Sequence, residues 1–136
     1  KKEAVIDWGR VRETASLQIK EFNIKGTPTL HVESLSGGNQ QRTLLALLPP
    51  DLKLLALEHP TRGLDIESTL YIWGKLLERR KQGAAIIFAS ADLDEVLQYS
   101  DRILVFFGGR VIETARSSET TVEQLGYLIG GKKTSG

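Results

Sequence analysis

A serine and two glycines stand where the sequence predicts that a helix begins. Ser36, Gly37 and Gly38 follow a loop-like stretch and precede a helical pattern. Glycines let a phosphate approach the backbone, and the free N–H groups at a helix N-terminus, together with the positive end of the helix dipole, attract it. These residues can therefore bind an anion. On the three residues alone, a serine cap followed by a flexible turn is the commoner interpretation of such a segment.

A second polar pair follows a short apolar run. Glu58 and His59 come after residues 52–57, which predict a buried strand. A carboxylate at the carboxyl end of such a strand can hold a hydrated Mg²⁺. The imidazole of a histidine can orient a water molecule, but it lacks the fixed negative charge of a carboxylate.

The elements that must position these groups alternate between helix and strand. One-sided apolar spacing predicts helices, short apolar runs predict strands buried on both faces of a parallel sheet, and two glycines between apolar runs predict a hairpin. The fold class is therefore α/β, with a helical section at the front. In chain order we expect helices at 8–24 and from 36 to before Pro49, a strand–helix–strand unit at 52–57, 66–82 and 84–89, a short helix with a capping box of Asp92 and Glu95, a hairpin of 103–107 and 111–115, and a last helix at 121–129.

The composition excludes several kinds of protein. Of 136 residues, 40% are apolar and 26% are charged, as in an ordinary globular domain. The net charge of +1 gives no basic field for nucleic acid. There is no cysteine, and the two histidines, His31 and His59, lack metal-ligand spacing. We expect no membrane span and no secretion signal, because no apolar run approaches the roughly 18–20 residues that cross a bilayer.

Longer motifs carry a resemblance to a known family. The octet from Leu35 to Arg42 resembles the signature motif of ABC ATPases in its Leu-Ser-Gly-Gly-Asn-Gln-Gln form. Residues 54–65 resemble the family's Walker B strand and D-loop, and residues 89–96 and 100–103 are similar to the switch region and the segment before the final hairpin. Four motifs in the family's order are hard to obtain by chance.

The resemblance is strongest to one subfamily. The signature form with Asn39, and the string from Pro60 to Asp65, look most like the ATPases of simple-sugar and nucleoside importers. Those proteins fuse two nucleotide-binding domains, and this chain is similar to the C-terminal part of the second. The resemblance implies that residues 1–50 are part of the helical signature subdomain and that residues 51–136 are the Walker B half of a P-loop NTPase core.

The same resemblance implies the roles of individual residues. Ser36, Gly37, Gly38, Asn39 and Gln40 would face an ATP molecule held by another nucleotide-binding domain. Asp65 would lie in the D-loop, which communicates between two ATP sites. Its alternative role is an N-cap for the helix from Ile66, and both roles can hold together.

This chain departs from the family pattern at its own ATP site. Glu58 aligns with the magnesium-linked aspartate, His59 with the catalytic glutamate, and Ala91 with the switch histidine. Glu58 keeps a carboxylate for Mg²⁺ through water, whereas Ala91 cannot contact a γ-phosphate through its side chain. We therefore expect a weak or silent site here, and a competent one on the partner domain that this signature completes.

The sequence contains a decoy for the phosphate-binding Walker A loop. Residues 126–133 have its glycine and first-lysine spacing, but a helix rather than a strand precedes them. We interpret them as a helix C-cap with a basic tail, and residues 132–136 as a disordered tail. Without a Walker A loop, this chain alone is expected to have no ATPase activity.

The resemblance also implies cofactors, partners and location. In the full assembly we expect ATP and Mg²⁺, a second nucleotide-binding domain of the same or a paired polypeptide, transmembrane permease subunits, and a place on the cytoplasmic face of the cell membrane. Exposed sheet edge would favour self-association of the chain, and no nucleic acid is expected as a partner. The alternatives are a non-catalytic module that docks a membrane subunit or a regulator, and an ABC ATPase outside transport.

Overall fold

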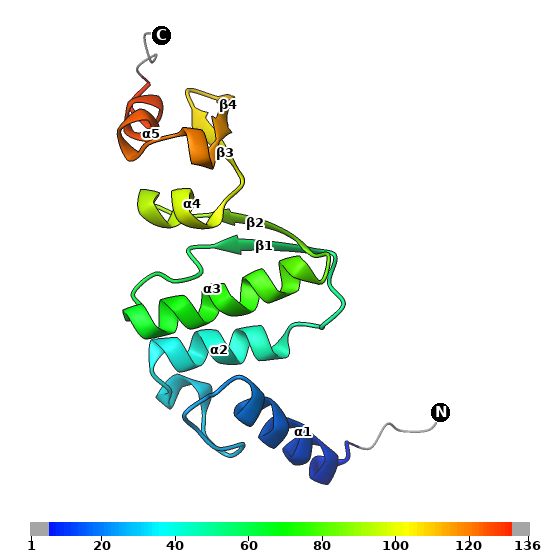
Figure 1. Cartoon of the computed structure of the whole chain (residues 1–136). Coiled ribbons are helices and arrows are strands. Elements are labelled where there is room, and N and C mark those ends of the chain that lie inside the picture. Colours follow the sequence, from blue (N-terminus) through cyan, green and yellow to red (C-terminus); the bar gives the residue numbers. More distant parts are fainter. Residues whose placement is uncertain (1–5, 132–136) are drawn as a thin grey trace. The chain divides into compact units, whose positions relative to one another are not determined.

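The computed structural model describes residues 6–131, in which helices and strands alternate as expected (Figure 1). Strands β1 and β2 pair in parallel, and β3 and β4 form an antiparallel hairpin, which confirms the α/β class. The tail predicted at residues 132–136 lies outside the described residues. The elements are α1 (Trp8–Glu21), a 3₁₀ turn (Val32–Ser34), α2 (Gly37–Leu47), β1 (Leu54–Glu58), α3 (Ile66–Lys81), β2 (Ala85–Ala89), α4 (Leu93–Tyr99), β3 (Arg102–Phe107), β4 (Arg110–Arg116), a second 3₁₀ turn (Ser117–Glu119) and α5 (Val122–Ile129).

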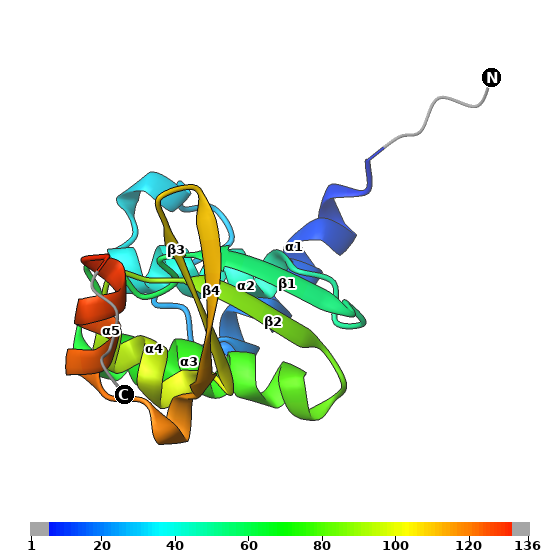
Figure 2. The same cartoon turned by 90° about the horizontal axis from the view of Figure 1, so that it is seen from above.

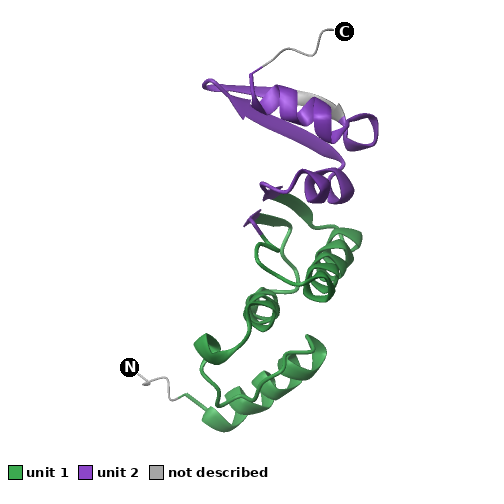
Figure 3. Cartoon of the chain, turned by 90° about the vertical axis from the view of Figure 1, so that its left-hand side faces the viewer, with its two compact units in different colours: residues 1–56, 60–87 green, residues 57–59, 88–136 purple. Residues whose placement is uncertain are grey.

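The chain divides into two compact units (Figure 3). Unit 1 comprises residues 1–56 and 60–87, and unit 2 comprises residues 57–59 and 88–136. The division expected at residue 50 concerns roles within a larger ATPase domain, and it stays a prediction. No helix among residues 6–131 is long and apolar enough to span a bilayer.

Helix α1 begins at the expected residue, Trp8, and ends earlier than expected. The side chain of Asp7 accepts a hydrogen bond from the backbone N–H of Arg10 at 3.1 Å. The helix was expected to run to residue 24, but it stops at Glu21 because Asn23 adopts a positive φ of 49°, which helical backbone does not allow. The turn that follows brings the chain back towards α2.

The strand–helix–strand segment is the expected crossover. Figures 1 and 2 show β1 and β2 side by side, with α3 along one side of β1. Within unit 1, α3 supplies the most deeply buried side chains, Ile72, Trp73 and Leu76. The strands are not buried on both faces as expected, because Leu54 is 55% and Ile87 63% exposed. The alternating pleat buries one face of this two-stranded sheet and leaves the other open.

Helices α2 and α3 run side by side in the same direction and are joined at both ends. Gly38, in the first turn of α2, is buried against Ser68 of α3, and a Cβ on this glycine would overlap the Ser68 hydroxyl and lie 3.0 Å from the Ser68 Cβ. At the other end, the Arg79 guanidinium donates to the carbonyl oxygens of Leu45, Leu48 and Pro49 at 3.3, 3.2 and 2.7 Å. Arg79 therefore satisfies the carbonyls of Leu48 and Pro49 just past the end of α2, and it is a second donor to the Leu45 carbonyl, which also accepts the Leu48 N–H at 3.3 Å.

Unit 2 is built around the terminal hairpin. Gly108 and Gly109 connect β3 to β4 with φ values of 55° and 73°, the positive values that a two-residue type I′ turn requires. The short helix α4 begins at the expected cap, since Asp92 accepts the Glu95 N–H at 3.1 Å. The small core of the unit contains Ile103, Val105 and Leu125, against which Leu93, Val96, Leu97 and Leu128 pack.

The decoy segment is a helix end. Helix α5 starts with a complete capping box between Thr121 and Gln124, and it ends at the cap residue Gly130. Residues 126–131 therefore close a helix and do not open one, as expected; the two lysines that follow lie outside the described residues.

The contact between α2 and α3 predicts a stability difference between two glycines. Gly38→Ala should lower the free energy of unfolding by about 1–3 kcal/mol, because its methyl group must displace the buried Ser68. Gly74→Ala, within α3, is the control: no atom lies within 4 Å of the added Cβ, so it should raise stability by roughly 0.5–1 kcal/mol. Urea denaturation of the chain measures both. Equal stability of the two variants would contradict this packing.

The cap of α3 predicts a dependence on pH. The backbone N–H of Ser68 donates to Asp65 Oδ1 at 2.7 Å, and this bond lowers the pKa of the Asp65 carboxyl below its ordinary value. A lowered folded-state pKa contributes stability above the unfolded-state pKa, and that contribution is lost as the pH falls through the folded-state value.

Asp65→Asn keeps a capping oxygen but removes the titration. The stability advantage of the native chain over this variant should therefore shrink between about pH 6 and about pH 3. Asp65→Ala should be less stable than either at neutral pH, because its cap is lost. Denaturation curves at both pH values test this, and a difference between native chain and Asp65→Asn that does not change with pH would refute it.

Candidate functional site

The signature segment opens α2 with its donors uncovered. Ser36 occupies the N-cap position with extended backbone (φ −60°, ψ 155°), and its carbonyl accepts the Gln40 N–H at 2.9 Å. The Ser36 hydroxyl, however, accepts no backbone N–H of the first turn. Ser36 is therefore the N-cap residue, as the commoner interpretation of the sequence has it, but it does not cap the helix through its side chain, and the first-turn N–H groups are left for another acceptor. Binding of an anion by this turn stays a prediction.

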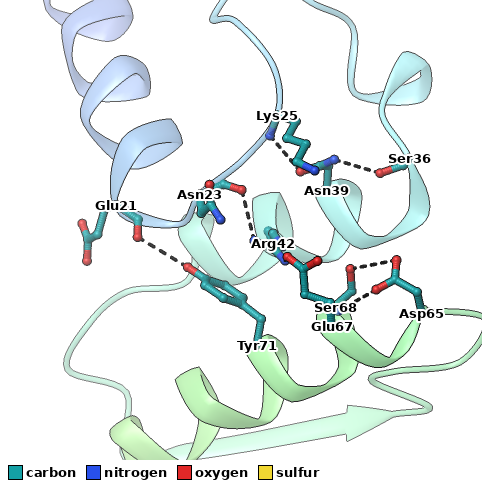
Figure 4. Close-up of polar contacts among 10 residues, drawn as sticks. All are labelled: Glu21, Asn23, Lys25, Ser36, Asn39, Arg42, Asp65, Glu67, Ser68 and Tyr71. Carbon is teal, nitrogen blue, oxygen red and sulfur yellow. Dashed lines mark hydrogen bonds and ion pairs between the residues drawn. The ribbon is translucent and has the colours of Figure 1, made fainter.

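Asn39 holds the Ser36 hydroxyl instead. Figure 4 shows the Asn39 amide between two groups: its Oδ1 accepts the backbone N–H of Lys25 at 2.8 Å, and its Nδ2 donates to Ser36 Oγ at 2.8 Å. The neighbouring Gln40 side chain donates to the carbonyl of Leu35 at 2.9 Å. The Asn39 and Gln40 side chains therefore hold the Ser36 hydroxyl and the Leu35 carbonyl in place at the start of α2.

The two glycines of the segment have different surroundings. Gly37 is exposed, and a Cβ on it would meet only the Leu64 side chain at 3.7 Å, an ordinary contact. Gly38 is buried against Ser68. Gly37 therefore leaves the outer surface of the turn open, whereas the fold itself requires Gly38 to be a glycine.

Asp65 is linked to the signature segment through one residue. Ser68, 7% exposed, faces Gly38 and donates to Asp65 through both its backbone N–H and its hydroxyl, at 2.7 and 3.3 Å. The structure thus confirms the N-cap role of Asp65 and brings it beside the start of α2, while its role between ATP sites stays a prediction. No sequence pattern predicted the role of Ser68, whose only local signal is its place three residues after the cap.

A buried arginine, whose role no sequence pattern predicted either, secures the other side of the segment (Figure 4). The Arg42 side chain is 6% exposed, lies 4.0 Å from the centre of the Tyr71 ring, and donates to the carbonyl of Asn23 at 3.1 Å. Its ion pair with Glu67 is long, at 4.0 Å, and Glu67 is 83% exposed, so the pair contributes little.

Tyr71 continues the link to α1. Its hydroxyl donates to the carbonyl of Glu21 at 3.4 Å, and burial raises its pKa. Arg42 and Tyr71 therefore tie the end of α1 to both α2 and α3.

The second polar pair lies in unit 2, at the carboxyl end of β1 as expected. Glu58 is the exposed last residue of the strand, and half-buried His59 follows with a positive φ of 47°. The His59 N–H donates to the carbonyl of Ala89 at 2.8 Å, which fixes this turn to the end of β2. The left-handed backbone is uncommon for a residue with a Cβ, and no sequence pattern predicted it.

No cluster of three or more acidic, histidine or cysteine side chains that could hold a metal is found within residues 6–131. The contact of Glu58 with Mg²⁺ through water therefore stays a prediction. Ser36–Gln40 and Asp65 belong to unit 1, and Glu58 and His59 to unit 2.

Comparison with known proteins identifies relatives over most of the chain. The chain is 38% identical over 132 residues to the guanosine import ATP-binding protein NupO of Bacillus subtilis, covering 93% of this chain and 25% of that protein. It is 46% identical over 125 residues to a putative ribose/galactose/methyl galactoside import ATP-binding protein of Rhizobium etli, covering 90% and 24%. The chain thus spans about a quarter of the length of these relatives. No family model matches it.

Solved structures agree on the fold. A putative metal-chelate type ABC transporter matches 96% of this chain and 52% of its own with a TM-score of 0.73, at 17% identity. An ATP-binding subunit of an ABC transporter matches 92% and 56%, with a TM-score of 0.69 and 17% identity. The chain therefore belongs to the ABC ATPase family, with the fold of part of its ATPase domain, and is homologous to a segment of sugar- and nucleoside-import ATP-binding proteins.

Proposed function

We propose that this chain is a segment of the ATP-binding subunit of an importer for simple sugars or nucleosides, and that the start of α2 completes an ATP site on a partner nucleotide-binding domain. The observation that carries the proposal is the uncovered first turn of α2. It combines N–H groups that no side chain caps, an exposed Gly37 and a hydroxyl held in place by Asn39. Such a turn fits the terminal phosphate of a nucleotide presented by another domain.

The relatives support the choice of substrate class. Those matched over about nine-tenths of this chain are named as import ATP-binding proteins for guanosine, nucleosides, ribose and arabinose. In the assembly that we propose, the subunit lies on the cytoplasmic face of the membrane against transmembrane permease subunits, and pairs with a second nucleotide-binding domain. Transport of the solute would be coupled to attack of water on the γ-phosphate.

The chain's own site is proposed to hydrolyse weakly or not at all. Glu58 is an exposed carboxylate at the end of a strand, which fits a hydrated Mg²⁺ bound through water. When bound, Mg²⁺ would neutralise charge on the nucleotide phosphates. His59 is fixed by its backbone bond to Ala89, but it brings no fixed negative charge to activate water. The proposal is thus an asymmetric pair of sites, in which this chain serves mainly its partner's.

Gly37→Ala separates this function from folding. In the chain, the variant should unfold at the same or a higher urea concentration, because the new Cβ meets only Leu64 at 3.7 Å. In the complete importer, ATP turnover should fall at least about tenfold. The added methyl group lies where the phosphate would approach, and it weakens the hydrogen bonds from the N–H groups that open α2.

Gly74→Ala is the matched control for that assay. It also adds one methyl group to a glycine with open space around it, but in the middle of α3. Turnover of this control should equal that of the native importer. Native turnover in Gly37→Ala would remove the support for a phosphate contact and favour a non-catalytic docking module.

A further inference from the structure

The Asn39 amide has its orientation fixed by the backbone. Nitrogen and oxygen of an amide side chain are hard to tell apart by shape, and their hydrogen-bond partners decide between them. The group 2.8 Å from one end of the Asn39 amide is the N–H of Lys25, which can only donate. That end is therefore Oδ1, and the end facing Ser36 is Nδ2.

This orientation in turn fixes the polarity of Ser36. An amide nitrogen can only donate, so Ser36 Oγ must accept from it at 2.8 Å. Within residues 6–131, no acceptor takes the hydrogen of the Ser36 hydroxyl. One lone pair of the exposed Ser36 hydroxyl is therefore occupied, and its hydrogen is available to an acceptor outside the chain.

The Lys25 N–H, which holds the Asn39 amide, is itself held in place. Two residues earlier, the carbonyl of Asn23 accepts from the buried Arg42 guanidinium, one turn along α2 from Asn39, at 3.1 Å. Between them, the Ile24 side chain is buried and its N–H donates to the carbonyl of Ile19 at 2.9 Å. The Lys25 N–H is thus a fixed donor against α2.

We propose that Asn39 is a positioning residue that makes Ser36 a hydrogen-bond donor to the terminal phosphate of the partner's nucleotide. This inference rests on the proposed function and refines it, since the sequence alone placed Asn39 among the direct nucleotide contacts. A phosphate oxygen only accepts hydrogen bonds, so a serine that presented its lone pairs would repel the phosphate. Asn39 acts through Ser36 by keeping the hydroxyl hydrogen free.

Asn39→Asp tests the polarity with almost no change in shape. One carboxylate oxygen still accepts the Lys25 N–H, but the other now accepts the Ser36 hydroxyl hydrogen, which reverses the second bond. In the complete importer, this variant should reduce ATP turnover at least about tenfold, as Ser36→Ala should. The double variant should lose no more than the larger single loss, because both changes remove the same donor.

Two controls separate positioning from charge and from folding. Gln41→Glu adds the same charge two residues further along α2, at a side chain that has no hydrogen bond to Ser36, and should cost much less turnover than Asn39→Asp. Hydrogen exchange of the Lys25 amide in the 136-residue chain should stay slow in Asn39→Asp. If Asn39→Asp loses that protection, Asn39→Leu is tested in its place. Turnover should then be lower in Asn39→Leu than in the native importer, and adding Ser36→Ala to Asn39→Leu should lower it no further.

A second readout does not depend on hydrolysis. The affinity of the assembled nucleotide-binding domains for a non-hydrolysable ATP analogue should fall in Asn39→Asp and in Ser36→Ala, without additivity. If Ser36→Ala changes neither affinity nor turnover, the proposed function fails and this inference with it. If Ser36→Ala lowers both but Asn39→Asp lowers neither, or if their losses add, the positioning role is refuted while the proposed function stands.

Discussion

The close approach of Gly38 to Ser68 is the constraint on which the arrangement of unit 1 depends. Because Gly38 has no side chain, the first turn of α2 can lie directly against the first turn of α3. The buried Ser68 then serves both helices, since it packs on Gly38 and donates twice to Asp65. At the opposite ends of the helices, Arg79 makes three hydrogen bonds to the last carbonyls of α2 and its following turn. The signature segment is therefore presented on a rigid pair of helices.

Within this pair of helices, the residues of the signature segment have different roles. Gly38 faces inward and belongs to packing, whereas Gly37 faces outward and leaves its turn open. Asn39 and Arg42 face the segment that follows α1, and both hold its backbone in place. Ser36 is the residue left with a hydrogen to give. The motif looks like one glycine-rich patch in the sequence, but its residues have different structural roles along one helical turn.

Much of the fold follows from local signals, and the errors come from contacts between distant residues. The caps at Asp65 and Asp92 were visible in the sequence because a cap and its partner lie three residues apart. The strands were expected to be buried on both faces because their apolar runs lack alternation, yet Leu54 and Ile87 are exposed. Burial depends on what packs from elsewhere, which local pattern cannot give. The roles of Ser68, Arg42 and Arg79 were missed for the same reason, because each contacts a segment that is distant in the sequence. Arg42 donates to a carbonyl 19 residues away and Arg79 to one 34 residues away, and Ser68 of α3 packs against Gly38 of α2.

The central claim is that the first turn of α2 contacts the terminal phosphate of a nucleotide bound mainly by another domain. A cryo-electron microscopy structure of the complete importer with a non-hydrolysable ATP analogue tests it most directly. The account predicts Ser36 Oγ and the N–H groups that open α2 within about 3.2 Å of γ-phosphate oxygens. A nucleotide bound in the closed assembly with its γ-phosphate out of reach of this turn would contradict it.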